Sequence, residues 1–514
     1  MNFHDSDKAI EDLERAVASR RPEVIADTAT LNIWPLYSLH NAALISAVKA
    51  LPSSVLDRRP ILKIIHPLTP VLARTNRPFK PLVTAETARG MSPAELDVMT
   101  LVQMVGFRFS GDVSASLIYA KRLEDRITQT RVESRERADG PLWFYHFHIG
   151  STYLTAGDFT QALLQFATAR QLGRLSGQRD AERLILGRMA LSHALRGSLV
   201  DAENALGELA TLPEPTPVHR DACIMTVRAA AAIIAVDQMT DTAEDLLPGL
   251  DPYDSILLTW PEALLARTRW LIATHRPDEA LEAIRLARDA HPVQHGAFAN
   301  DVINSTSIEA LTDLGETTAA RRVADTHGEC GALTRLAVIR LALTESRLDA
   351  AAKGIVRLRR DEDLAPGHRT QLVLLDAWLE MQRTGSLDSE TARHVWRFAT
   401  RTENRRMLAG VPGPLIDLVR PQLSAEDAQD LEAGVSGLSH IETQPRPKLT
   451  NGELRVLNAL ATHSTTAKIA SSFHVSPNTI KSQLKSMYRK LGCSTREEAI
   501  LIASRTHLFT SEFS

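Results

Sequence analysis

Basic side chains collect near the C-terminus of the chain. Lys481, Lys485, Arg489 and Lys490 lie within ten residues of one another, with Ser482 among them. Lys and Arg only donate hydrogen bonds, and their positive charge suits a partner rich in phosphates or other acceptors. Apolar residues recur there at intervals of three and four, which puts them on another face of a helix: Ile480, Leu484, Met487, Tyr488 and Leu491. The spacing predicts a helix with a buried apolar stripe and an exposed basic face.

Two capping boxes mark the ends of the unit that must position this helix. Thr450 and Glu453 have the spacing of the first box, which opens a helix from residue 451 to about 463. Ser494 and Glu497 have the spacing of the second box, which opens a fourth helix, Thr495–Ser504.

Between these boxes, single caps predict two further helices. Thr465 can cap a short helix over 466–473, and Ser476 followed by Pro477 opens a longer one over 477–491. Two helices joined by a tight turn, the second of them basic, form a helix-turn-helix. That motif places its second helix in the major groove of DNA.

The charge distribution agrees with this interpretation. The 514 residues carry 59 Lys and Arg against 62 Asp and Glu, a net charge of -3. From Pro445 to the end there are ten Lys or Arg and four Asp or Glu, so this part carries +6 and the rest -9. Five of the 11 lysines fall in the last 67 residues. A small basic unit therefore follows a large acidic one.

The pattern LT..E..VL..LA, followed by IASSFHVSPNTIKSQLKSMYRKLGCSTREEAILIA, closely resembles the DNA-binding domain of LuxR-type transcription regulators, from Leu449 to Ala503. The resemblance implies roles for three sets of residues. The base contacts would come from Lys481, Ser482 and Lys485. The phosphate contacts would come from Lys468, Thr479, Arg489 and Lys490. The fourth helix would dimerise through Thr495, Glu498, Ala499 and Ile502.

The remainder of the chain is predicted to be all-α and repetitive. Residues 150–169 resemble the tetratricopeptide pattern, although His146 stands at the usual Trp position. Later segments keep a turn followed five residues on by a small residue, which lets paired helices approach closely. Those alanines are 40, 41, 37, 40 and 31 residues apart: Ala162, Ala202, Ala243, Ala280, Ala320 and Ala351. We therefore predict a tetratricopeptide-like helical-repeat solenoid, whose concave surface would bind an effector or a protein.

These patterns divide the chain into four parts. Residues 1–140 form a helical region, either diverged repeats or a cap, that cannot be phased with the repeats. Residues 141–432 form the tetratricopeptide-like sensing or interaction domain. Gly, Ser and Pro mark residues 433–447 as a linker. Residues 448–514 form the four-helix DNA-binding domain.

Other chemistries lack a supporting pattern, so we predict no enzyme activity, cofactor or metal. No GxxxxGK[ST] occurs, so a phosphate-cradling loop for ATP hydrolysis is not expected. His146 and His148 would point in different directions on a helix, which disfavours a shared metal ion. The three cysteines, Cys223, Cys330 and Cys493, show no paired spacing.

The function predicted from the sequence is a transcription regulator that binds double-stranded promoter DNA as a homodimer, with RNA polymerase as its downstream partner. The N-terminus lacks the apolar stretch of a signal peptide and the longest apolar run is 229–236, which predicts a cytoplasmic protein that does not enter a membrane. A protein-interaction scaffold with a vestigial or protein-binding C-terminal domain remains the alternative. Neither the operator sequence nor the signal can be predicted.

Overall fold

Every regular element of the computed structural model is a helix, within the residues it describes. These are 3–33, 35–36, 40–56, 58–59, 62, 81, 88–89, 91, 93–129, 142–175, 180–216, 219–253, 259–291, 296–325, 331–441, 449–462, 465–473, 475–491 and 493–505. Within these ranges the only β-type pairing is an isolated bridge between Pro412 and Ile441. The all-α prediction is therefore confirmed for this part of the chain.

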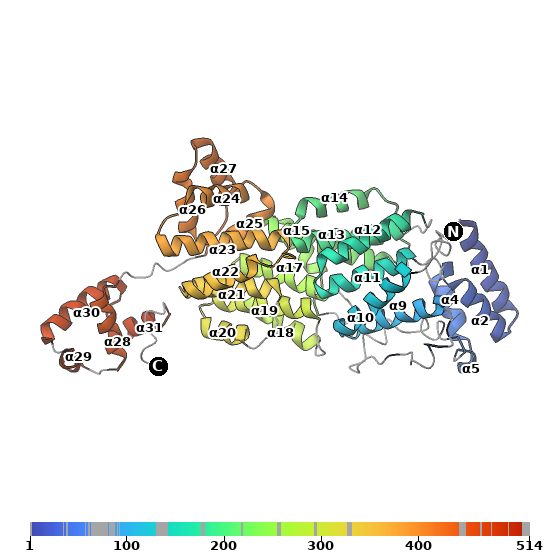
Figure 1. Ribbon diagram of the computed structural model, residues 1–514, viewed down its shortest axis with the longest axis horizontal. Coiled ribbons are helices and arrows are strands. Elements are labelled where there is room, and N and C mark those ends of the chain that lie inside the picture. Colours follow the sequence, from blue (N-terminus) through green and yellow to red (C-terminus); the bar gives the residue numbers. More distant parts are fainter. Residues whose placement is uncertain are drawn as a thin grey trace.

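Four N-terminal helices form a small cluster with its own core, at one end of the molecule (Figure 1). They are α1 (Phe3–Ala18), α2 (Pro22–Leu31), α4 (Asn41–Lys49) and α5 (Ser53–Leu56). Their shared core contains Leu13, Leu36, Leu44 and Leu62, all fully buried.

Eight helix pairs follow, and we call them the array (residues 93–399). The pairs are α9 (Pro93–Phe109) and α10 (Val113–Gln129), α11 (Leu142–Ala156) and α12 (Phe159–Leu175), α13 (Ala181–Arg196) and α14 (Leu199–Ala210), α15 (Arg220–Gln238) and α16 (Thr242–Leu246), α17 (Trp260–Ala273) and α18 (Pro277–Ala290), α19 (Ala297–Asp313) and α20 (Thr317–Asp325), α21 (Ala332–Thr344) and α22 (Leu348–Arg359), and α23 (Pro366–Thr384) and α24 (Ser389–Ala399). The first helix of each pair packs on the first helix of the next.

The predicted alanines lie where the two helices of each pair meet. All six, Ala162, Ala202, Ala243, Ala280, Ala320 and Ala351, have no exposed surface. The turn before each one contains a residue with positive φ: Gly157, Gly197, Met239, His275, Gly315 and Ser346. In five pairs this residue precedes the alanine by the expected five positions, and in the remaining pair Met239 precedes Ala243 by four.

The structure also shows the repeat pattern in α9 and α10, which could not be aligned with the repeats from the sequence. Gly111, between α9 and α10, has φ +83°, and Ser116, five residues later, has no exposed surface. Ser116 thus takes the place of the alanine in the pair α9–α10. Because serine is small but polar, a search for recurring alanines misses this pair.

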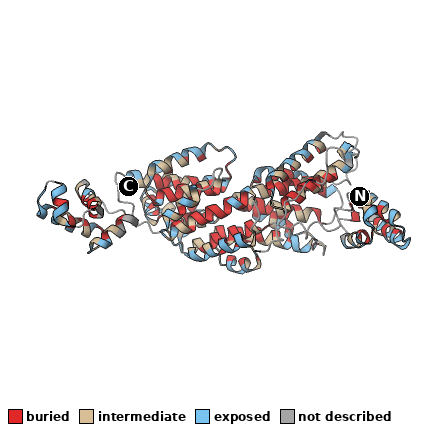
Figure 2. Cartoon of the chain, turned by 90° about the horizontal axis from the view of Figure 1, so that it is seen from below, coloured by how far each residue is buried: buried red, intermediate tan, exposed pale blue. Residues whose placement is uncertain are grey.

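The array closes on itself at two places. Early pairs contact late ones: Phe159 stacks edge-to-face on Phe298 of α19, with ring centroids 5.5 Å apart. Gly197 meets Gly367 of α23 so closely that a Cβ on Gly197 would lie 2.6 Å from the Gly367 Cα. Helix α19 is buried over every residue from 301 to 308. Figure 2 shows in red how buried residues run through the interior of the helical body.

Three short helices follow the array and pack on α23 and α24: α25 (Arg405–Ala409), α26 (Gly413–Val419) and α27 (Ala425–Val435). The predicted linker 433–447 includes residues that the structure places in α27 or packed against the array. Leu438 and Ile441 pack against the array core, and the His440 imidazole contacts the Leu408 carbonyl oxygen at 3.0 Å. Two apolar anchors thus hold a segment whose Gly and Ser content is typical of linkers.

Candidate nucleic-acid interface

Four helices after residue 449 form a separate cluster, the C-terminal domain (Figure 1). They are α28 (Asn451–Thr462), α29 (Thr466–Ser472), α30 (Pro477–Leu491) and α31 (Arg496–Arg505). Each boundary lies within one residue of its prediction. His474, in the predicted tight turn between residues 473 and 477, lies outside the described residues, as do His463 and Gly492 at the ends of the first and third predicted helices.

The predicted caps of the first three helices are confirmed. The Thr450 backbone N–H donates to Glu453 Oε2 at 2.7 Å, and the Glu453 N–H donates back to Thr450 Oγ1 at 3.3 Å. Thr465 Oγ1 accepts the Lys468 N–H at 3.3 Å, and Ser476 Oγ accepts the Thr479 N–H at 3.1 Å. Local sequence therefore sets where α28, α29 and α30 begin.

The cap of α31 differs from its prediction by one residue. The reciprocal bonds join Thr495 and Glu498, at 3.1 and 3.2 Å, and not Ser494 and Glu497. Glu498 Oε2 also accepts the Ser494 N–H at 2.8 Å. Both registers satisfy the capping pattern in sequence, and the pair with the additional Ser494 bond is the one that forms.

Helix α30 has the two faces predicted for it. Its apolar side chains are buried in the core of the domain, with fully buried Ile480 and Met487 at its centre. Lys481, Ser482, Lys485 and Arg489 are exposed. Residues four apart lie on the same side of a helix, so these side chains form one surface. No acidic residue occurs in α30 to neutralise it.

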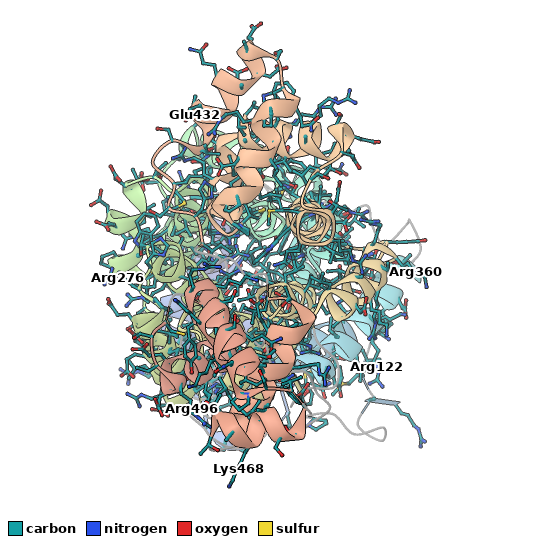
Figure 3. All side chains as sticks on the ribbon, turned by 90° about the vertical axis from the view of Figure 1, so that its left-hand side faces the viewer. Arg122, Arg276, Arg360, Glu432, Lys468 and Arg496 are labelled. Atoms are coloured by element: carbon teal, nitrogen blue, oxygen red, sulfur yellow. The ribbon has the colours of Figure 1, made fainter. Side chains whose placement is uncertain are left out.

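Two further predicted contacts flank this surface. Lys468 on α29 is exposed, and Figure 3 shows its side chain directed away from the rest of the molecule. Thr479, in the first turn of α30, is exposed too, and its hydroxyl lies 2.9 Å from Ser476 Oγ. A base-reading helix needs such flanking donors, because phosphate contacts set its register on DNA.

Lys490, the remaining predicted phosphate contact, has a partner inside the domain. Its ammonium donates to Glu453 Oε2 at 2.7 Å, and the Glu453 side chain is only 6% exposed. Burial alone would raise the pKa of Glu453, but the bonds from Lys490 and Thr450 outweigh it and lower that pKa to about 2. Glu453 therefore caps α28 and also ties it to the end of α30.

Sequence reasoning missed two arginines that hold the helices together. The Arg455 guanidinium lies over the Phe473 ring, 4.8 Å from its centroid, and so joins α28 to the end of α29. Arg496 donates to the Leu460 carbonyl oxygen and joins α31 to α28. Both contacts link residues that are distant in sequence, so no local pattern could have revealed them.

The four predicted dimerisation residues do not form one exposed patch. Thr495 and Glu498 are exposed but bond to each other, and Ala499 has no exposed surface within the core of the domain. The side chain of Ile502 lies outside the described residues. Thr495 and Glu498 are therefore the described members of this set that a second copy could reach.

The family model for "Bacterial regulatory proteins, luxR family" (GerE) matches residues 447–503, which contain these helices almost completely. The C-terminal domain is a luxR-family domain. This match confirms the resemblance at the C-terminus, and it does not extend to the array.

A relative of this chain is also named as a transcription regulator. The transcriptional regulatory protein YdfI of Bacillus subtilis (strain 168) is 27% identical over 182 residues, which cover 31% of this chain and 84% of that protein. No solved structure matches the chain significantly. The domain and the relative support a DNA-binding transcription regulator, a class that usually has no enzyme activity.

Two features of the described residues bear on other functions. None of their helices combines the length and apolarity needed to span a bilayer. Within the same ranges, no three His, Cys, Asp or Glu side chains are grouped so as to hold a metal ion. His146 instead contacts Gln165 Oε1 at 2.7 Å, and His148 contacts Arg108 at 3.0 Å.

Proposed function

We propose that this protein is a transcription regulator that binds double-stranded promoter DNA through α30 of its luxR-family domain. The observation that carries the proposal is the exposed surface of Lys481, Ser482, Lys485 and Arg489 on a helix whose other side is fixed in a core. In this proposal, Lys481, Ser482 and Lys485 contact base edges, where lysine donates to guanine acceptors.

The phosphate contacts come from Lys468, Thr479 and Arg489, which are exposed around that surface. We assign Lys490 chiefly to the stability of the domain, because its ammonium already serves the buried Glu453 carboxylate. Two copies would bind paired half-sites about one helical turn apart, with α31 at or near their contact. RNA polymerase is the expected downstream partner, in the cytoplasm.

The array is proposed as a tetratricopeptide-like solenoid that receives a signal and controls the luxR-family domain. The recurring positive-φ turn and the buried small residue after it support this assignment for pairs from α9 to α22. Residues 442–448 would then connect the sensing part to the DNA-binding part.

The proposal is tested by selecting bound sequences from random double-stranded DNA with the full-length protein, and then measuring affinity by fluorescence anisotropy. Lys481→Ala and Lys485→Ala should each weaken binding to the selected site by about 1–3 kcal/mol, and affinity should fall steeply with salt. The matched control is Lys353→Ala, which removes an exposed lysine from α22 of the array.

Selection of no preferred sequence would reject the regulator and favour the scaffold alternative. Equal losses for Lys353→Ala and Lys481→Ala would also count against it, because they would indicate a response to net charge alone. Circular dichroism of each variant separates lost contacts from lost structure.

A further inference from the structure

The array contains charged side chains that the proposed DNA-binding surface does not use. Glu262 of α17 is one of them, and burial raises its pKa to about 7. Others line a cavity of about 60 Å³ whose walls come from α17, α19, α21, α23 and α25. They are Arg269, Glu309, Asp313, Arg340 and Arg406. Empty cavities in proteins are apolar, so a cavity with these walls is expected to hold polar contents.

Two arginines of the cavity wall share one carboxylate. Arg406 Nε donates to Asp237 Oδ1, and Arg269 Nη1 lies 3.6 Å from the same oxygen. At that distance the two groups form an ion pair without a hydrogen bond. Arg269 is only 8% exposed, yet it donates no hydrogen bond to the residues that the structure describes. This part of the wall therefore carries one positive charge in excess, on a guanidinium whose donors are unused.

Two carboxylates of α19 produce the opposite imbalance around Arg340. Glu309 and Asp313 are four residues apart, so they lie on the same side of α19, and both line the cavity. Arg340 donates to Asp313 Oδ1 at 2.7 Å, whereas its buried Nε has no hydrogen-bond partner. Glu309 is half-buried and forms no hydrogen bond or ion pair with the described residues. This part of the wall therefore carries one negative charge in excess.

We propose that the cavity binds a small α-amino acid, whose carboxylate bonds to Arg269 and whose ammonium group bonds to Glu309. A zwitterion supplies one partner of each sign, whereas a simple anion or cation would leave the other charge of the wall unmatched. Hydrogen bonds between charged groups are also the strong ones. One water position takes up about 10–15 Å³, so the cavity holds about four to six non-hydrogen atoms, which is the size of glycine or alanine.

The cavity also reaches the segment that leads to the luxR-family domain. Ser439 and Ile441 line it, and Ile441 packs against the core of the array. A bound ligand would therefore favour the arrangement in which Ile441 stays packed, as far as it binds the packed and released arrangements unequally. That the amino acid is the signal for the luxR-family domain rests on the proposed function. The binding itself does not.

The test uses full-length protein without DNA, with glycine and L-alanine as probes at millimolar concentration. At least one of them should raise the thermal midpoint saturably and give a saturable heat in calorimetry. Acetate and methylammonium each carry only one of the two charges of glycine, so each should bind about 10-fold more weakly than the better amino acid, or weaker still. Small solutes also stabilise proteins when they are excluded from the surface, so the specific effect is the saturable part.

Glu309→Gln removes the proposed partner of the ammonium group and should weaken amino-acid binding about 10-fold or more. Without ligand it should not lower the thermal midpoint, because Glu309 has no ion pair to lose. Arg269→Lys keeps the charge beside Asp237 without the planar fork, so it should also bind the amino acid more weakly. The matched control is Glu316→Gln, which removes an exposed carboxylate from the turn after α19 and should leave binding unchanged.

The proposal is overturned if neither amino acid binds the wild-type protein, or if Glu309→Gln and Arg269→Lys both bind as wild type does. Acetate or methylammonium binding as tightly as the better amino acid would also overturn it, because the cavity would then recognise a single charge. Saturable amino-acid binding by a protein that selects no DNA would retain this site and reject the regulator. Normal DNA selection without amino-acid binding would do the reverse.

Discussion

On α30 of the C-terminal domain, Lys481, Lys485 and Arg489 are exposed, whereas in the array Arg108, Arg269 and Arg340 are at most 8% exposed. The exposed charges need no partner within the chain, because water solvates them until a polyanion replaces it. The buried charges must find partners inside the fold or bind a ligand there.

The difference indicates two uses of the same residue types. Exposed cations make binding strong but sensitive to salt, and substituting them should leave stability unchanged. Buried cations fix which distant segments meet, and substituting their partners should unfold or open the array. Variants that separate affinity from stability therefore test whether exposed and buried charges differ in this way.

The largest effect is expected at Asp237 on α15. Its carboxylate is 3% exposed and lies between Arg406 of α25 and Arg269 of α17. Asp237→Ala would leave two buried guanidinium groups facing each other, so we expect a loss of about 3–5 kcal/mol in the free energy of unfolding, measured with urea.

The control for Asp237 is Asp289→Ala, which breaks an exposed pair with Arg285 at 2.7 Å on α18. Exposed pairs contribute about 0–1 kcal/mol, so this variant should remain near wild type. Similar losses for the two variants would show that burial does not distinguish the charges of the array.

The next effect depends on pH and concerns Glu262. Because its pKa is raised from 4.5 to about 7 in the folded protein, the folded state binds more protons than the unfolded state between these values. Glu262 therefore lowers stability progressively as pH rises from about 4.5 to about 7, and the penalty stays constant above that.

Glu262→Gln removes this penalty, so its thermal midpoint should equal that of wild type near pH 4.5 and exceed it most above pH 7. The corresponding gain in stability is at most about 3 kcal/mol. Taking the difference between the two proteins at each pH cancels the other titrating groups. A difference that does not change with pH would contradict the assignment.

Two glycines with the same backbone conformation test the closure of the array. Gly197 has φ +76° and Gly315 has φ +77°, so alanine costs about 1–2 kcal/mol at either position through conformation alone. A Cβ on Gly315 would meet no atom within 4 Å, whereas one on Gly197 would collide with the Gly367 backbone. Gly197→Ala should therefore lose about 1–3 kcal/mol more than Gly315→Ala.

The measurement is the thermal midpoint of both variants, with Gly385→Ala as a further control, since it also has a positive φ and no neighbour within 4 Å. Equal shifts at 197 and 315 would mean that the early and late pairs do not meet as described.

The sequence predicts whatever depends on neighbours along the chain. Thr450, Thr465 and Ser476 cap helices that start within one residue of their predicted positions, because a cap acts on the N–H groups of its own first turn. The six alanines were found for a similar reason, since a turn and the small residue after it lie within one helix pair.

Contacts between distant segments could not be predicted in this way. Asp237 and Arg406 are 169 residues apart, and each alone looks like an ordinary charged helix residue. The closure at Gly197 and Gly367 depends on how small rotations between pairs accumulate, which one pair does not reveal. The same holds for the luxR-family domain. From its sequence Lys490 looks like a surface cation, but in the structure it pairs with Glu453.

The smallest effect on stability is expected in the luxR-family domain, where Lys490 is paired and Lys481 is not. Lys490→Ala leaves the Glu453 carboxylate buried with Thr450 and Ser486 as its remaining partners, so local stability should fall by about 1 kcal/mol. Lys481→Ala removes an exposed charge and should lower DNA affinity without this loss.

Hydrogen exchange of peptides from 449–462 and 477–491 in the full-length protein measures the first effect, and anisotropy with the selected DNA measures the second. Faster exchange in Lys490→Ala alone, and the larger affinity loss in Lys481→Ala, would separate a structural lysine from a binding one nine residues away. If Lys490→Ala exchanges as wild type does and binds DNA as weakly as Lys481→Ala, then its role is the phosphate contact that the family resemblance implies. Pairing with the buried Glu453 carboxylate would then no longer divide the cations of α30 into two kinds.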